Sequence, residues 1–226
     1  MNRAPFESLD HAADATADGL VRAAAGSAFD LFRDTEFRRL ASLDQLSQTE
    51  QDRIFNELVV ASVVLIMLLL EAPDLRMAAD VRAYCAELRT RIPRAHVGQL
   101  RSLGVEGEHL RDWERLITMR YEEYAGDRHD VRAAAMHIAS LEKSLSVDGL
   151  SKIQLLVPLQ ATVIGCHHHV CRGSTDGRDE LFKAMLRSLS RLYLELRVTL
   201  ECGKITPLTR ARVAVKKALR RMRSRT

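Results

Sequence analysis

Apolar residues recur every three or four positions along most of this chain, the spacing that places them on one face of an α-helix. The clearest case is residues 109–124, where the apolar positions are Leu110, Trp113, Ile117, Tyr121 and Tyr124. Similar stripes predict helices over residues 6–25, 27–43, 74–91, 128–146 and 176–203. No segment shows the period of two that a half-buried strand requires. The pattern therefore predicts an all-helical protein.

One predicted helix, residues 47–72, is apolar on every side over residues 58–70. Ser47 and Glu50 have the spacing of a capping box, in which the serine accepts from the N–H three residues on and the glutamate returns the bond. Residues 58–70 then contain a single polar residue, Ser62. A helix without a polar face has to be covered by other protein, so we expect this helix at the centre of a bundle.

The alternative interpretation of this stretch is a membrane span. At about 1.5 Å per residue, residues 58–70 extend roughly 20 Å, which is shorter than the ~30 Å hydrocarbon core of a bilayer. A longer window brings in Asn56, Glu57 or Glu71. The buried core helix is therefore the preferred prediction.

Residues 153–170 form the second strongly apolar segment, with Pro158 inside it. We expect Pro158 to kink its helix, Pro93 to interrupt the helix that starts near residue 74, and Gly126 to end the one that starts near residue 109. The fold prediction is a single all-α bundle of about eight helices with two strongly apolar central helices. Residues 1–203 form the bundle domain, and residues 204–226 form a separate basic amphipathic helix.

Composition fits a soluble globular protein, with 46% hydrophobic and 28% charged residues among 226. The N-terminus has no apolar run of the kind found in a secretory signal, so we expect a cytoplasmic protein. Its four cysteines would then be reduced thiols. A chain of this length buries enough surface to fold without disulfide or metal staples.

The net charge of +4 hides an uneven distribution. Residues 1–203 carry all 30 acidic residues and 25 of the 34 basic ones, a net charge of −5. Residues 204–226 carry nine basic residues and no acidic one, a net charge of +9. The basic character of the protein therefore belongs to its C-terminal segment.

The C-terminal segment combines a narrow apolar stripe with an almost purely cationic remainder. The basic residues predicted to bind a partner are Arg210, Arg212, Lys216, Lys217, Arg220, Arg221 and Arg223. They could contact nucleic-acid phosphates or an acidic protein surface. An anionic membrane surface is a weaker alternative, because the stripe lacks Trp and Phe. The alternative without an external partner is a terminal helix docked on the acidic body of its own bundle.

Residues 166–171, with the sequence Cys-His-His-His-Val-Cys, hold the only concentration of metal-ligand chemistry. The candidate ligands are Cys166, His167, His169 and Cys171, which suit zinc, while haem is another possibility. On a continuous helix, however, these four side chains point in two directions, so a site needs ligands from elsewhere. Cys202, Cys85, His137 and His109 could supply them. The simpler expectation is that no cofactor binds, that Cys166 and Val170 pack as small apolar groups, and that the histidines lie in solvent at a helix end.

No phosphate-binding glycine loop, nucleophile elbow or helical zinc-protease motif is present. The leading hypothesis is a non-enzymatic helical interaction or scaffold protein whose basic C-terminal helix contacts an acidic partner or a nucleic-acid backbone. The alternative is a metal- or haem-binding helical enzyme or sensor that uses residues 166–171. A homodimer is also possible, because the two apolar helices could bury each other between two copies.

Overall fold

The computed structural model spans residues 1–226 and describes residues 9–71, 79–142 and 146–200. This part of the chain is all-helical, with seven α-helices and one short 3-10 helix, as the sequence predicts. The elements in order are α1 (Leu9–Phe32), α2 (Thr35–Leu40), η1 (Leu43–Gln45), α3 (Gln48–Leu70), α4 (Ala79–Ser102), α5 (Gly107–Leu141), α6 (Val147–Val170) and α7 (Asp179–Leu200).

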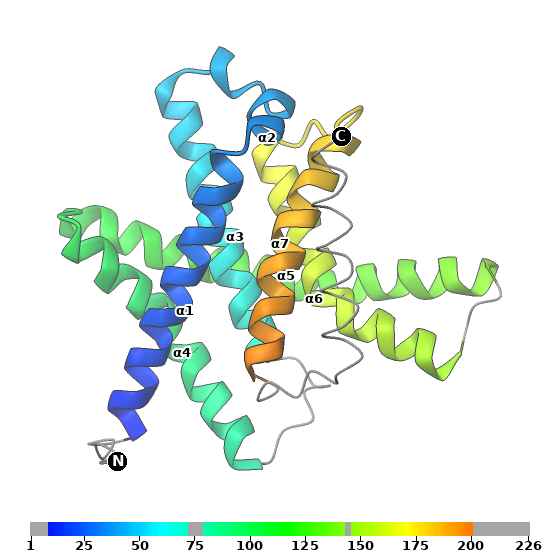
Figure 1. The fold of residues 1–226 in the computed structure, drawn as a ribbon, viewed down its shortest axis with the longest axis horizontal. Coiled ribbons are helices and arrows are strands. Elements are labelled where there is room, and N and C mark those ends of the chain that lie inside the picture. The colour runs from blue at the N-terminus through cyan, green and yellow to red at the C-terminus, as the bar shows by residue number, and fades with distance from the viewer. Residues whose placement is uncertain (1–8, 72–78, 143–145, 201–226) are drawn as a thin grey trace, which may run out of the picture.

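Helix α3 is the centre of the bundle, and every residue from 57 to 70 in it is buried. Helices α1, α4, α5, α6 and α7 all pack against it. Figure 1 shows α3 between α1 and α7, with α5 crossing behind them. Since each fully buried leucine, isoleucine or valine contributes about 1.5–3 kcal/mol, this one helix supplies a large share of the core.

At the start of α3, one of the two hydrogen bonds of the predicted capping box is present. Ser47 is the N-cap residue, and its hydroxyl accepts from the backbone N–H of Glu50 at 3.4 Å. The carboxylate of Glu50 does not return the bond. It binds Arg53 and Arg172 instead, because these guanidinium groups offer stronger, charge-assisted hydrogen bonds than a backbone amide.

Several predicted helix boundaries are wrong. The predicted helix over residues 27–43 is divided at Asp34, the N-cap residue of α2. Helix α1 is continuous where a break near Gly26 was expected, and α5 continues through Gly126. Glycine ends a helix by adopting a left-handed conformation, which the structure shows at Gly104 and Gly173 but at neither of these positions. A glycine that keeps helical dihedral angles costs the helix only about 1 kcal/mol relative to alanine.

The predicted interruption at Pro93 is also wrong, since α4 runs through it. A proline removes one backbone hydrogen bond, but Ile92 and His96 on either side of it are buried against the bundle. Tertiary packing therefore holds the helix together across the proline. The predicted start of this helix near residue 74 lies outside the described residues.

Two helical corners project from opposite sides of the bundle (Figure 1). On one side α4 meets α5 near Leu103. On the other side the last third of α5 and the first half of α6 form a hairpin, which we call the α5–α6 arm (residues 131–141 and 147–157). Figure 1 also shows that α6 changes direction about halfway along, where Pro158 lies inside the helix.

Two helices are long and apolar enough to cross a membrane, judged by length and composition. They differ in how the protein covers them. The apolar window of α3 is 83% buried inside the bundle, whereas that of α6 is only 44% buried. Helix α3 thus has the environment of a core helix. Helix α6 is mostly buried over residues 157–170, while residues 149–156 are half-buried or exposed.

Candidate functional site

The structure sends the side chains of residues 166–171 in different directions. Cys166 is fully buried towards α3, with its Sγ 3.8 Å from the carbonyl oxygen of Glu57. His167 faces α7, where its ring packs edge-on against Phe182. His169 faces α5, and its Nε2 lies 2.7 Å from a carboxylate oxygen of Glu123. The four candidate ligands are therefore not brought together around one point.

Within the described residues, no group of three or more His, Cys, Asp or Glu side chains is placed to hold a metal ion. Burial also raises the pKa of the Cys166 thiol and that of the Cys171 thiol, which favours the neutral form over the metal-binding thiolate. His109 and His137 are exposed on α5, and Cys85 is buried in α4. Cys202 lies outside the described residues.

A buried ion-pair network lies directly beneath this segment and joins three helices. Arg120 on α5 donates two hydrogen bonds to the carboxylate of Glu57 on α3, at 2.9 and 3.2 Å. It also donates to Glu123 at 3.2 Å, and Glu123 in turn contacts His169 on α6. The side chains of Glu57 and Arg120 are only 10% and 13% exposed. This pair is therefore a desolvated charge contact in a core that is otherwise apolar.

The two charges of the central pair depend on each other. Burial by itself lowers the pKa of Arg120, but the hydrogen bond and the negative charge of Glu57 outweigh it, so that the pKa of Arg120 lies above its usual value. A buried charge without a partner is far costlier than a buried pair. The network therefore fixes the register of α3 against α5 and α6 more than it adds to stability.

Tyr124 occupies the space next to this network. Its side chain is fully buried, and within the described residues its hydroxyl has no hydrogen-bond partner. Burial raises the pKa of Tyr124, so this hydroxyl stays neutral. The ring lies against Gly165 of α6, where a Cβ atom would come within 2.2 Å of a ring carbon. Gly165 is therefore required for the close approach of α5 and α6.

The carboxyl end of α6 is held by a second set of contacts from α3. Arg53 donates to the carbonyl oxygens of His169 and Val170, at 2.8 and 3.2 Å. A cation at a helix C-terminus stabilises the partial negative charge there. Glu50 bridges Arg53 and Arg172, which continues the contact past the end of the helix. The Cys-His segment is thus held in place by charged side chains of α3.

His96 on α4 is a second buried polar group, away from this network. It is 3% exposed, its ring packs edge-on against Trp113 at 5.3 Å, and within the described residues neither ring nitrogen has a hydrogen-bond partner. Burial lowers the pKa of His96 from 6.5 to about 4. The imidazole is therefore neutral at pH 7.

The stability of the protein should fall as the pH drops from 6.5 to 4. The unfolded chain binds a proton at His96 in this window while the folded protein does not, which costs about 3 kcal/mol by pH 4. Chemical unfolding at pH 7, 5.5 and 4.5 measures it. The variant His96→Leu should flatten this dependence and unfold at higher denaturant concentration at pH 5. His129→Leu, an exposed control on α5, should leave the dependence as it is; an unchanged slope in His96→Leu would contradict the assignment.

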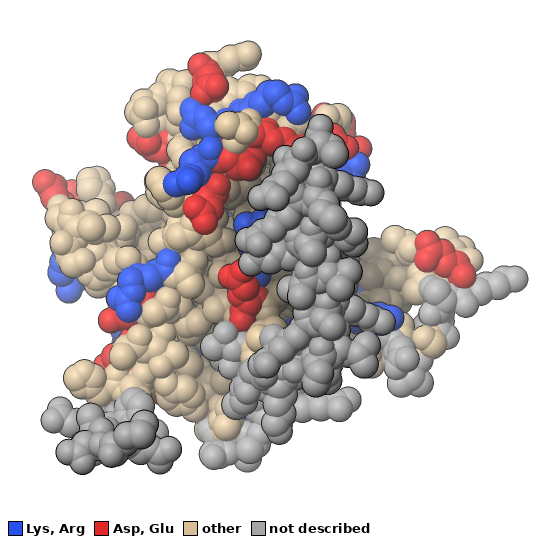
Figure 2. Space-filling view, in the orientation of Figure 1, with Lys and Arg blue, Asp and Glu red and all other residues tan. Residues whose placement is uncertain are grey.

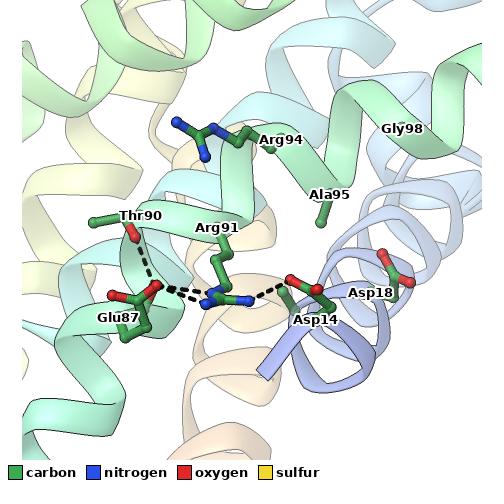
Figure 3. A pocket seen from close by; sticks show the side chains of 9 residues that line it. Asp14, Asp18, Glu87, Thr90, Arg91, Arg94, Ala95 and Gly98 are labelled. Atoms are coloured by element: carbon green, nitrogen blue, oxygen red, sulfur yellow. Dashed lines mark hydrogen bonds and ion pairs between the residues drawn. The ribbon is translucent and has the colours of Figure 1, made fainter. Parts of the chain in front are cut away.

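A surface groove with a volume of about 480 Å³ lies between α1 and α4 (Figure 3). Arg91 bridges Asp14 and Glu87 across it, with distances of 2.7 and 2.9 Å. Asp18 and Arg94 also line the groove, and Arg94 points away from the bridge in Figure 3. Arg91 and the two carboxylates pair with each other across the groove. These charges are therefore better explained as an interhelical salt bridge than as a preformed ligand site.

The described surface carries charges of both signs. Figure 2 shows acidic and basic side chains interspersed over the visible face. Several are paired within the body, such as Arg38 with Asp44 and Arg187 with Glu36. The seven basic residues predicted to bind a partner, Arg210 to Arg223, lie outside the described residues.

Comparison with known proteins identifies no relative. No family model, no curated protein and no solved structure matches this chain.

Proposed function

We propose that the protein is a non-enzymatic helical interaction protein. In this proposal the bundle, residues 1–203, is the scaffold, and the basic helix, residues 204–226, contacts an acidic protein surface or a nucleic-acid backbone. The observation that carries it is the separation of charge, with −5 on the first part and +9 on the second. Docking the basic helix on its own body would still leave a net charge of +4 to attract a polyanion.

The ion pairs of the body support this proposal. Acidic side chains that could neutralise the basic helix are already engaged with arginines of the body, as in the pairs Asp14–Arg91, Glu36–Arg187 and Asp44–Arg38. Exposed pairs of this kind contribute little stability, but each one reduces the acidic surface that is open to the basic helix.

The α5–α6 arm offers a second surface for a partner. Five large apolar side chains on it are more than one third exposed: Met136, Ile138, Leu141, Leu150 and Leu156. Two helices can shield only part of their apolar surface from water, and exposed apolar groups that cluster on a projecting element are typical of interaction sites. The arm is therefore the part of the described structure best suited to contact another molecule.

The proposal includes a cytoplasmic location. The high burial of α3 supports it, because a helix covered by five others has no surface left for lipid. The first half of α6 is apolar but largely uncovered, so a membrane surface is the second candidate partner for the arm. A metal or haem at residues 166–171 stays an untested alternative, which elemental analysis and an absorbance spectrum of freshly purified protein would test.

Removal of residues 204–226 should abolish polyanion binding while helicity and the thermal midpoint stay nearly unchanged. With about seven phosphate contacts, binding of the full chain to random-sequence duplex DNA should weaken about 10³- to 10⁵-fold between 50 and 200 mM salt. Fluorescence anisotropy at several salt concentrations measures this, with circular dichroism as the folding check.

The matched control keeps the chain length and replaces the seven basic residues by glutamine. This variant should lose DNA binding as the truncated protein does, and Arg115→Gln on the exposed face of α5 should retain it. If the truncated protein unfolds, the basic helix is part of the core and the proposal fails. Equal DNA binding by all four proteins would also refute it.

A further inference from the structure

Two arginines pair with Glu71 at the carboxyl end of α3, and a third follows one helical turn further along α5. Arg89 comes from α4, while Arg128 and Arg132 come from α5, where they are one helical turn apart on the same face as Tyr121. Within the described residues, Glu71 is the only carboxylate paired with any of them. We call Glu71, Arg89, Tyr121, Arg128 and Arg132 the arginine cluster.

The ion pairs between Glu71 and its two arginines are long. Its carboxylate oxygens lie 3.5 Å from a nitrogen of Arg89 and 3.4 Å from one of Arg128, whereas a charged N–H···O bond is normally about 2.7–2.9 Å long. The closest contact of Glu71 is with the hydroxyl of Tyr121, which donates to it at 2.7 Å. Glu71 therefore leaves most guanidinium donors of the cluster unused.

The guanidinium groups of the cluster have a surplus of N–H donors. Each guanidinium group has five N–H donors. Arg89 donates to the hydroxyl of Tyr121 and lies over its ring, and Arg128 donates from Nε to the carbonyl oxygen of Ala125 at 3.1 Å. The Nε of Arg132 is buried and, within the described residues, has no partner at all. Such an unpaired charged donor is expensive to bury, unless an anion satisfies it.

The local charge favours an anion. Three arginines and one glutamate sum to +2, and the C-terminus of α3 adds roughly half a negative charge. The remainder is still above +1. The cluster is also open to solutes, because the side chains of Arg89, Arg128 and Glu71 are 32%, 24% and 35% exposed. Partial burial strengthens charged hydrogen bonds without closing the site.

We propose that the arginine cluster is a binding site for a phosphate group. Arg128 and Arg132 present planar forks of donors that match the oxygens of a phosphate, and Arg89 adds a third positive charge from the facing helix. Tyr121 fixes Arg89 by stacking and by its hydroxyl. The site goes beyond the proposed interaction function, since it uses none of residues 204–226 and none of the exposed apolar side chains of the arm, although Arg132 lies at the base of that arm.

The test is isothermal titration of the full chain with inorganic phosphate, against a sodium chloride titration of equal ionic strength. The wild type should bind with a Kd below about 1 mM. Arg132→Gln should weaken binding about tenfold, since it removes one forked, charged contact. This variant should fold normally, because it removes an Nε donor that is buried without a hydrogen-bond partner within the described residues. Arg115→Gln, on the exposed face of the same helix, should bind within about twofold of wild type.

A second titration with a short-chain phosphatidic acid, kept below its micelle concentration, separates a soluble phosphate from a lipid headgroup. Binding of either compound that depends on Arg132 supports the site, and the tighter of the two identifies the source. No heat beyond the chloride control at about 10 mM phosphate would overturn the proposal. Equal binding by wild type and Arg132→Gln would overturn it as well. Neither result bears on the basic helix, because the DNA assay tests that separately.

Discussion

Replacement of Arg120 by methionine should lower the free energy of unfolding by about 3–5 kcal/mol. The substitution keeps most of the side-chain volume but leaves the carboxylate of Glu57 buried in α3 without its two hydrogen bonds. Glu123 would lose a partner as well, although it retains His169. Urea unfolding followed by circular dichroism at pH 7 measures the loss.

The double variant Glu57→Leu/Arg120→Met should be far less destabilised than Arg120→Met alone. Replacing both members of a buried ion pair by apolar groups of similar size is often neutral, because the cost of desolvating the charges disappears with them. Arg115→Met, an exposed position on the same helix, should change stability by less than about 0.5 kcal/mol. If the single and the double variants lose the same stability, the buried charge of Glu57 is not the cause.

The second large effect is expected at Gly165, where alanine should destabilise the protein by about 1–3 kcal/mol or more. The added Cβ would lie 2.2 Å from one carbon of the Tyr124 ring and 2.5 Å from another, so α5 and α6 would have to move apart. That movement also strains the contacts of Arg120 and Glu123, which lie on α5 next to Tyr124. Thermal unfolding of the purified variant measures the effect.

Gly126 provides the matched control, because it lies inside α5 with no atom within 4 Å of a Cβ placed there. Gly126→Ala should therefore raise stability by about 0.5–1 kcal/mol through helix propensity alone. Opposite signs at the two glycines would show that the close packing of Tyr124 against Gly165 is real. A neutral or stabilising Gly165→Ala would mean that the two helices are not in contact there.

The sequence predicts the core of this fold because the signal for it is local. Residues 58–70 have no polar face, and Ser47 caps the helix as its spacing indicates. The all-helical class and the stripe on α5 follow from periodicity in the same way. The breaks predicted at Gly26, Pro93 and Gly126 are wrong because packing on both sides of each residue, and not the residue itself, decides whether a helix continues.

The candidate site was less accessible to sequence reasoning. Residues 166–171 attract notice by composition, yet their separate directions depend on which helix each face meets. The Glu57–Arg120 pair left one weak signal, an acidic residue at the edge of an otherwise apolar run. Its partner is 63 residues away in the chain, and only the packing of α3 against α5 identifies it. The exposure of the apolar side chains on the arm could not be predicted for a similar reason. Periodicity indicates an apolar stripe on a helix but does not show whether another element covers that stripe.

The central claim is that the two apolar helices belong to a bundle folded in water, with α3 as its core. The most direct test is fractionation of cells lysed without detergent, followed by a high-salt wash that releases protein held only by its basic segment. We predict that the protein is recovered in the soluble and salt-released fractions and unfolds cooperatively. Recovery only in the membrane pellet, with release by detergent alone, would contradict the claim.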